Sequence, residues 1–156
     1  ALQAGSVQIA ALAYPSYIQA LRMDMKELVN FSELGFEAVN AALVSTRTYL
    51  AQNRDQTTRF MRAFVRAMQR FRNDKEFSKK VLSKYFRTTD EQILEASWKD
   101  VAPNLARVPK PSTKAIQFII DGQFKDKNPL PKPESFVDTS IIDQLERSGF
   151  IDAVYK

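Results

Sequence analysis

The chain has 156 residues, of which 44% are hydrophobic and 26% charged, a size and composition typical of one globular domain. It contains no cysteine and no histidine, which excludes disulfides, thiolate nucleophiles, Ser-His-Asp triads and zinc sites built from those residues. The net charge of +5 is uneven, because residues 54–87 hold eleven basic and three acidic groups.

Three short segments in the first third of the chain have the pattern of β-strands. Residues 7–12 are apolar and suit a buried strand of a mostly parallel sheet, and residues 27–31 predict a second short strand. Residues 41–49 combine apolar, β-branched and aromatic side chains without Gly or Pro, which predicts a third strand. The later pattern has helical period, so the sequence predicts a helix-rich α/β fold.

The segment from Tyr14 to Tyr17 is the best candidate for a ligand site. Pro15 favours a turn after the first strand and can occupy the first turn of a helix over Ser16–Met25. Ligands of open α/β sheets gather at the carboxyl ends of strands, beside the helices that follow. The alternative is that the two tyrosine rings simply pack, with their hydroxyls at the surface.

The clearest predicted helix follows the third strand. Asn53-Arg54-Asp55-Gln56 has the pattern of a capping box, and apolar residues then recur at helical spacing as far as Phe71. Another face of this helix carries Arg59, Arg62, Arg66 and Arg70. We expect a solvated face there, and its functional alternative is a docking surface for a partner.

The remaining chain predicts further helices and one extended segment. Capping boxes at residues 73–76 and 88–91 open two helices, the second of which ends before Pro103. Ser112 caps another helix, residues 125–134 carry three prolines and are extended, and Gly149 stops a helix over residues 141–147. No apolar run reaches the roughly 18 residues of a membrane-spanning helix, and no signal pattern opens the chain.

Catalytic and metal chemistry find little support in these residues. Glu33 and Glu37 are a pair of carboxylates that could serve acid–base catalysis, but solvated loop charges are the simpler interpretation. We therefore expect no enzyme activity, no catalytic residues, no metal and no cofactor.

Four stretches, spread over nearly the whole chain, resemble one protein family. They are AGSVQIAAL at residues 4–12 with Tyr14-Pro15, ALVSTRTYLAQN at residues 42–53, Arg59-Phe60-Met61-Arg62-Ala63, and Phe136-Val137-Asp138 with SGFID at residues 148–152. In this order they are similar to the C-terminal half of periplasmic solute-binding proteins of ABC importers. The group is that of nitrate, sulfonate and taurine, which includes proteins related to thiamine-pyrimidine synthesis. Gln8 and Arg54 depart from the family pattern, in which Asp and Pro are frequent.

The resemblance implies a fragment of a two-lobed α/β fold of the type II periplasmic-binding class. Residues 1–40 would be a remnant of the second lobe, residues 41–50 a strand that crosses the hinge, and residues 51–156 a helical part packed mainly on the first lobe. The implied ligand-binding residues are Tyr14, Pro15, Ser16, Tyr17 and Asn40.

The implied function is that of the substrate-binding component of an ABC importer. Such a protein captures a small solute, here anionic or aromatic, in the cleft between its lobes and delivers it to a permease in the membrane. The implied location is the periplasm or the extracellular face of the cell membrane, with no nucleic-acid partner. A fragment without its sheet partners would expose a strand edge and an apolar face, so we also expect association with a second copy.

An alternative of a different class is a helical interaction module. It would use the basic Arg-rich helix to bind an acidic protein or nucleic acid. This alternative predicts an affinity that falls steeply with salt and depends on the four arginines, whereas a solute-binding protein predicts little binding to nucleic acid.

Overall fold

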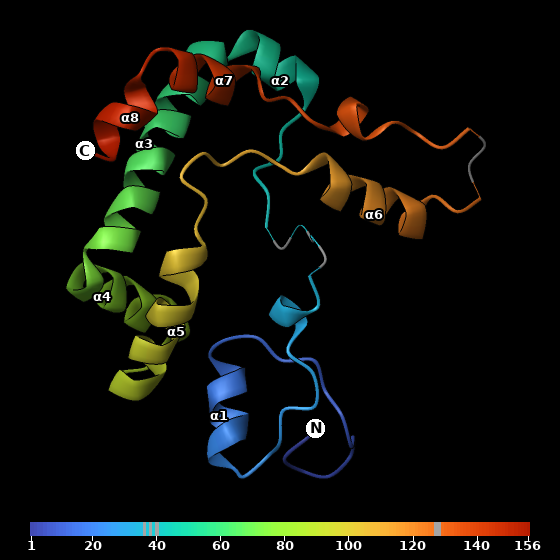
Figure 1. Ribbon diagram of the computed structural model, residues 1–156, viewed down its shortest axis with the longest axis vertical. Helices are drawn as coiled ribbons and strands as arrows, with labels where there is room; N and C mark the ends of the chain where they lie inside the picture. Colours follow the sequence, from blue (N-terminus) through green and yellow to red (C-terminus); the bar gives the residue numbers. More distant parts are fainter. Residues whose placement is uncertain (36, 38, 40, 127–128) are drawn as a thin grey trace. The chain divides into compact units, whose positions relative to one another are not determined.

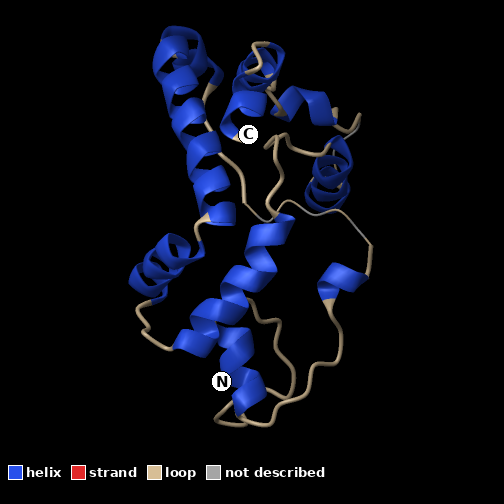
Figure 2. Cartoon of the chain, turned by 60° about the vertical axis from the view of Figure 1, so that its left-hand side comes forward, coloured by secondary structure: helices blue, strands red, loops and turns tan. Residues whose placement is uncertain are grey.

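The computed structural model describes residues 1–35, 37, 39, 41–126 and 129–156, and every regular element in this part of the chain is a helix (Figure 1, Figure 2). The chain divides into two compact units. Unit 1 comprises Ala1–Asn30 and Phe71–Asn104, and unit 2 comprises Phe31–Arg70 and Leu105–Lys156. The longest helix, α3 (Arg54–Asn73), therefore contributes residues to both units.

The predicted sheet is absent from the described residues, so the expected α/β fold is wrong, and so is its two-lobed, type II periplasmic-binding form. None of the predicted strands at 7–12, 27–31 and 41–49 is formed. Residues 7–12 and 41–46 are irregular, the short 3-10 helix η1 (Phe31–Glu33) begins at the end of the second segment, and α2 (Arg47–Gln52) includes the end of the third.

The absence of strands has a physical reason. Strand propensity measures how well a side chain fits a pleated, partly buried surface, so it takes effect only where a neighbouring strand supplies that surface. Here the side chains are exposed, by 72% at Ile9, 70% at Leu28 and 90% at Val44. Thr46 instead acts as the N-cap of α2, because its hydroxyl accepts a hydrogen bond from the Tyr49 N–H at 3.1 Å.

Unit 1 contains α1 (Ser16–Arg22), α4 (Lys75–Phe86) and α5 (Glu91–Asn104), and α5 contacts both other helices. Asp74 caps α4 by accepting from the Phe77 N–H at 3.0 Å, and Asp90 caps α5 by accepting from the Ile93 N–H at 3.2 Å. Both caps fall within the predicted capping boxes, but α5 continues through Pro103, which the sequence placed after its end.

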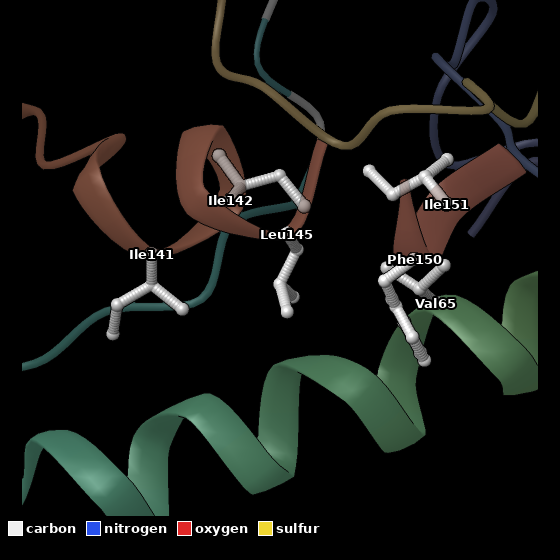
Figure 3. Close-up of a cluster of buried hydrophobic side chains, with 6 residues drawn as sticks. All are labelled: Val65, Ile141, Ile142, Leu145, Phe150 and Ile151. Carbon is white, nitrogen blue, oxygen red and sulfur yellow. The ribbon is translucent and has the colours of Figure 1, made fainter. Parts of the chain in front are cut away.

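Unit 2 is built on an apolar core between α3, α7 (Ser140–Arg147) and α8 (Phe150–Val154) (Figure 3). The core side chains are Val65, Ile141, Ile142, Leu145, Phe150 and Ile151. Gly149 joins α7 to α8 with φ of +72°, a left-handed conformation that favours glycine.

A second group of elements in unit 2 is α6 (Thr113–Gln123), which packs with the 3-10 helix η2 (Pro133–Phe136). Ser112 caps α6 as predicted, with its hydroxyl accepting from the Ala115 N–H at 3.3 Å. Across the described chain, no helix combines the length and the apolar character needed to span a membrane.

Candidate functional site

The candidate ligand segment lies where the irregular N-terminal stretch meets α1. The rings of Tyr14 and Tyr17 form an edge-to-face pair, with 5.5 Å between centroids and 71° between planes. The Tyr14–Pro15 peptide bond is cis, and Ser16 is the first residue of α1 and is exposed. The structure therefore places Tyr14, Pro15, Ser16 and Tyr17 together in unit 1. The fifth predicted residue, Asn40, lies outside the described residues.

Glu27 completes this cluster and was not predicted from the sequence. The Tyr17 hydroxyl donates a hydrogen bond of 2.6 Å to Glu27 Oε2. After α1 the chain reverses at Asp24, whose φ of 59° is left-handed, a conformation that Asp tolerates better than most residues. The helix predicted over Ser16–Met25 includes Asp24 and misses the reversal, whereas α1 ends at Arg22.

Both phenols of this cluster have a raised pKa. The hydrogen bond to Glu27 raises the pKa of Tyr17 to about 12. Partial burial raises the pKa of Tyr14, and the negative charges of Asp100 and Glu27 add to this effect. At neutral pH the cluster therefore presents two neutral hydroxyls and two aromatic rings beside negative charge.

This arrangement favours one class of ligand. Carboxylate oxygens accept hydrogen bonds from N–H groups, and aromatic faces attract positive charge and other rings. A simple anion would instead be repelled by Glu27 and by Asp100. The cluster thus suits an aromatic solute that carries N–H donors or a positive charge.

The predicted arginine row lies along exposed positions of α3. Arg59 pairs with Asp55 at 3.2 Å, one turn earlier on the helix. Arg62 and Arg66 lie over the ring of Phe150, at 4.3 and 5.3 Å from the guanidinium carbon to the ring centroid. Arg70 is also exposed. The row is solvated as predicted, but its two central members are held by an aromatic ring that the sequence did not reveal.

A cluster of opposite charges joins α4 to α5 and was not predicted. Lys79 is only 9% exposed and pairs with Glu91, while Glu95 accepts from Lys75 at 2.6 Å and pairs with Lys99 at 3.3 Å. The hydrogen bond from Lys75 is the main reason why the pKa of Glu95 is lowered. These residues line an open hollow of about 490 Å³, and their charges are paired with one another, so the cluster acts as a clasp between the two helices.

Glu33 and Glu37 were the two carboxylates considered for acid–base catalysis. Glu37 accepts a hydrogen bond from the hydroxyl of Ser112. In the part of the chain that the structure describes, no group of three or more carboxylates is placed to hold a metal ion.

Comparisons of the chain with protein-family models, with curated proteins and with solved structures found no match.

Proposed function

We propose that the chain is part of the substrate-binding component of an ABC importer, which captures a small organic solute outside the cell membrane and delivers it to a permease. The order and spacing of the four resembling stretches support this proposal. The proposal concerns binding and does not rest on the two-lobed α/β fold, which the described residues contradict.

The observation that carries the proposal is the cluster of Tyr14, Tyr17 and Glu27. It lies at the residues where the resemblance implies a ligand, and it combines rings with a hydrogen-bonded carboxylate. Of the two solute classes implied, anionic and aromatic, this cluster favours the aromatic one, because its own charge is negative. The proposed solute is therefore an aromatic ring bearing amino or ring N–H groups.

Calorimetric titration of the chain with three probes tests the proposal. The probes are 4-aminopyrimidine, which is aromatic and carries N–H donors, taurine, which presents a sulfonate, and nitrate. We expect binding of the aminopyrimidine alone, weakened about tenfold or more by Glu27→Gln, since a hydrogen bond to a charged group contributes about 1.5–3 kcal/mol. Glu134→Gln, at an exposed position of η2, removes the same charge away from the cluster and is the matched control, which should leave the affinity unchanged.

Two results would overturn the proposal. One is tighter binding of taurine or nitrate with no effect of Glu27→Gln, which would place the ligand elsewhere. The other is no binding by either this chain or the whole native protein, whose mass should be near twice 17.8 kDa if the chain is one half of it.

A second candidate function, the helical interaction module, is favoured by one specific observation. Neither Arg62 nor Arg66 forms an ion pair with a described residue, although both are fixed over Phe150. This candidate requires an affinity for an anionic partner that falls steeply as salt is added. Solute binding at Tyr14 requires no such dependence on salt.

A further inference from the structure

Arg22 joins the last turn of α1 to the start of α5. Both of its terminal nitrogens donate to the Asp90 carboxylate, Nη1 to Oδ2 and Nη2 to Oδ1 at 2.9 Å, and Nη2 also donates to Gln92 Oε1 at 2.7 Å. A paired bond between two planar groups fixes their orientation as well as their distance. Asp90 is itself held in place, because it caps α5. Arg22 therefore fixes the end of α1 at one defined place on α5.

Apart from this bond, α1 is a weakly anchored helix. It has seven residues, and a helix of about two turns is too short to be stable alone in water. It buries one side chain, Ala20, and its N-cap residue, Pro15, makes no side-chain capping hydrogen bond. The position of α1 on α5 thus depends strongly on the Arg22 side chain.

The hydrogen-bonded pair of the solute cluster, Tyr17 and Glu27, lies on either side of Arg22 in the chain. Tyr17 precedes Arg22 on α1 by about 7.5 Å along the helix axis, and Glu27 comes just after the reversal that ends the helix. That reversal starts in the last turn of α1, where the Met23 N–H donates to the Ala20 carbonyl at 3.0 Å. Anchoring Arg22 on α5 therefore anchors both partners of the hydrogen bond between Tyr17 and Glu27.

α5 also contributes a charge to the same cluster. Asp100 belongs to the C-terminal half of α5, and its negative charge acts on the phenols of both Tyr14 and Tyr17. α1 and α5 thus run in opposite directions, with Arg22 at the start of α5 and the tyrosines near its end. The cluster is complete only when α1 keeps this position, because the rings lie at the start of α1 and Asp100 belongs to α5.

We propose that Arg22 is a positioning residue of the solute site, which it assembles by fixing α1 on the Asp90 cap of α5. This inference rests on the proposed function, because the site concerned is the cluster of Tyr17 and Glu27. Arg22 acts through Asp90 and Gln92 and not on the solute. Without this anchor the solute itself must order Tyr17 and Glu27, and the cost of that ordering lowers its affinity.

Titration calorimetry with 4-aminopyrimidine measures the effect on binding. Arg22→Gln should weaken binding about tenfold, because two side chains are then no longer ordered in advance. The matched control is Lys75→Gln, which removes another cation that donates to a carboxylate of α5, that of Glu95, at 2.6 Å. Both variants should lower the stability of unit 1, measured by Trp98 fluorescence in urea, but Lys75→Gln should leave the affinity unchanged. Arg22→Lys keeps the charge, loses the planar group and should fall between wild type and Arg22→Gln.

A double-mutant cycle tests whether Arg22 acts through Asp90. Asp90→Asn keeps the cap and one accepting oxygen, so by itself it should weaken binding by only about threefold. In the Arg22→Gln background the same change should weaken binding by less than about twofold, because the guanidinium that Asp90 holds is already absent.

The Tyr17 hydroxyl gives a second readout, which needs no solute. In nuclear magnetic resonance spectra of a chain with isotope-labelled tyrosine, Tyr17→Phe identifies the Tyr17 signal. Glu27→Gln then gives the position of that signal when the hydrogen bond to the carboxylate is lost. Arg22→Gln should move the signal toward this position, and Lys75→Gln should leave it in place.

Failure of this inference can be told apart from failure of the proposed function. No binding of the aminopyrimidine by wild type would overturn the proposed function, and the Tyr17 signal would still decide whether Arg22 positions the cluster. Unchanged affinity and an unchanged Tyr17 signal in Arg22→Gln would overturn the inference alone. Equal losses of affinity in Arg22→Gln and Lys75→Gln would also overturn it, because they would reduce the effect to the stability of unit 1. A loss from Asp90→Asn that is the same in both backgrounds would show that Arg22 does not act through Asp90.

Discussion

The two units of this chain bury different kinds of side chain. In unit 2 every buried side chain among the described residues is apolar, and six of them form one cluster. Unit 1 also buries apolar side chains, but it contains all the buried polar ones in the described chain, namely Ser78, Lys79 and Ser97. The two serines donate hydrogen bonds of 2.7 Å, Ser78 to the Phe71 carbonyl and Ser97 to the Ile93 carbonyl.

The difference predicts different responses to solution conditions. Burial of apolar surface is non-directional and depends little on pH or on moderate salt. Ion pairs are weakened by salt, and carboxylates with perturbed pKa values make stability depend on pH. Unit 2 also has ion pairs and a lowered pKa at Asp143, so both units should respond to salt and pH, and the response particular to unit 1 is that of its buried cation, Lys79. Trp98, the only tryptophan of the chain, belongs to unit 1 and donates a hydrogen bond of 2.9 Å to the Phe71 carbonyl, so its fluorescence reports on that unit.

The largest expected effect comes from the core of unit 2. Leu145→Ala removes a side chain that is 2% exposed and leaves a cavity, which should lower the free energy of unfolding by about 2–5 kcal/mol. Urea unfolding followed by far-UV circular dichroism measures this loss, and Leu145→Met, which conserves volume, should cost less than about 1.5 kcal/mol. Leu145→Ala should shift the urea midpoint seen by circular dichroism more than the midpoint seen by Trp98 fluorescence. Equal shifts would mean that the two units unfold together, which would contradict the distinction drawn between them.

A smaller effect is expected in the clasp of unit 1. Lys79→Ala removes a buried stem and an ion pair and should cost roughly 1–3 kcal/mol, whereas Lys79→Met keeps the stem and should recover more than half of that loss. The ion pair itself contributes at most about 1 kcal/mol, because Glu91 remains 67% exposed. Trp98 fluorescence in urea measures both variants. Salt at about 1 M should reduce the difference in the free energy of unfolding between wild type and Lys79→Met. A difference that does not change with salt would show that the charge of Lys79 contributes nothing.

The smallest effect concerns acid, and its sign follows from Asp90. The hydrogen bond from Arg22, first, and the backbone N–H of Ile93 lower the pKa of this carboxyl in the folded chain. Its stabilising contribution is therefore complete above the unfolded pKa, about 3.9, and is lost as pH falls below that value toward the folded pKa. Asp90→Asn keeps a capping oxygen and removes the charge. Below about pH 4 the free energy of unfolding, measured by Trp98 fluorescence, should therefore fall less steeply in this variant than in wild type. An unaltered decrease would assign the acid sensitivity to other carboxylates.

Local patterns in the sequence predicted the helices well. The apolar stripe of α3, the Ser112 cap and the stop at Gly149 each depend on residues a few positions apart, and each is found in the structure. The strands failed because their pattern, for example at Val44, specifies only a preference, and pairing needs a neighbouring strand that the described chain does not provide.

The candidate site shows the same limit. The position of Tyr14 and Tyr17 could be predicted, because proline and helical period fix the start of α1 within a few residues. Glu27 could not, because its place beside Tyr17 results from the reversal at Asp24. Phe150 lies more than eighty positions after Arg62, and only the packing of α8 on α3 brings the ring under the arginines.

The irregular segments at residues 7–12 and 41–46 have a consequence for the lifetime of the chain. A protease must draw several residues of backbone into its active-site groove, and segments without helical hydrogen bonds require little local unfolding to enter it. Residues 41–46 carry no Lys or Arg, but Leu43 and Val44 are 54% and 90% exposed. Enzymes that cleave after apolar residues should therefore cut here before they cut within α3, and a partner that covers this segment would slow that cleavage.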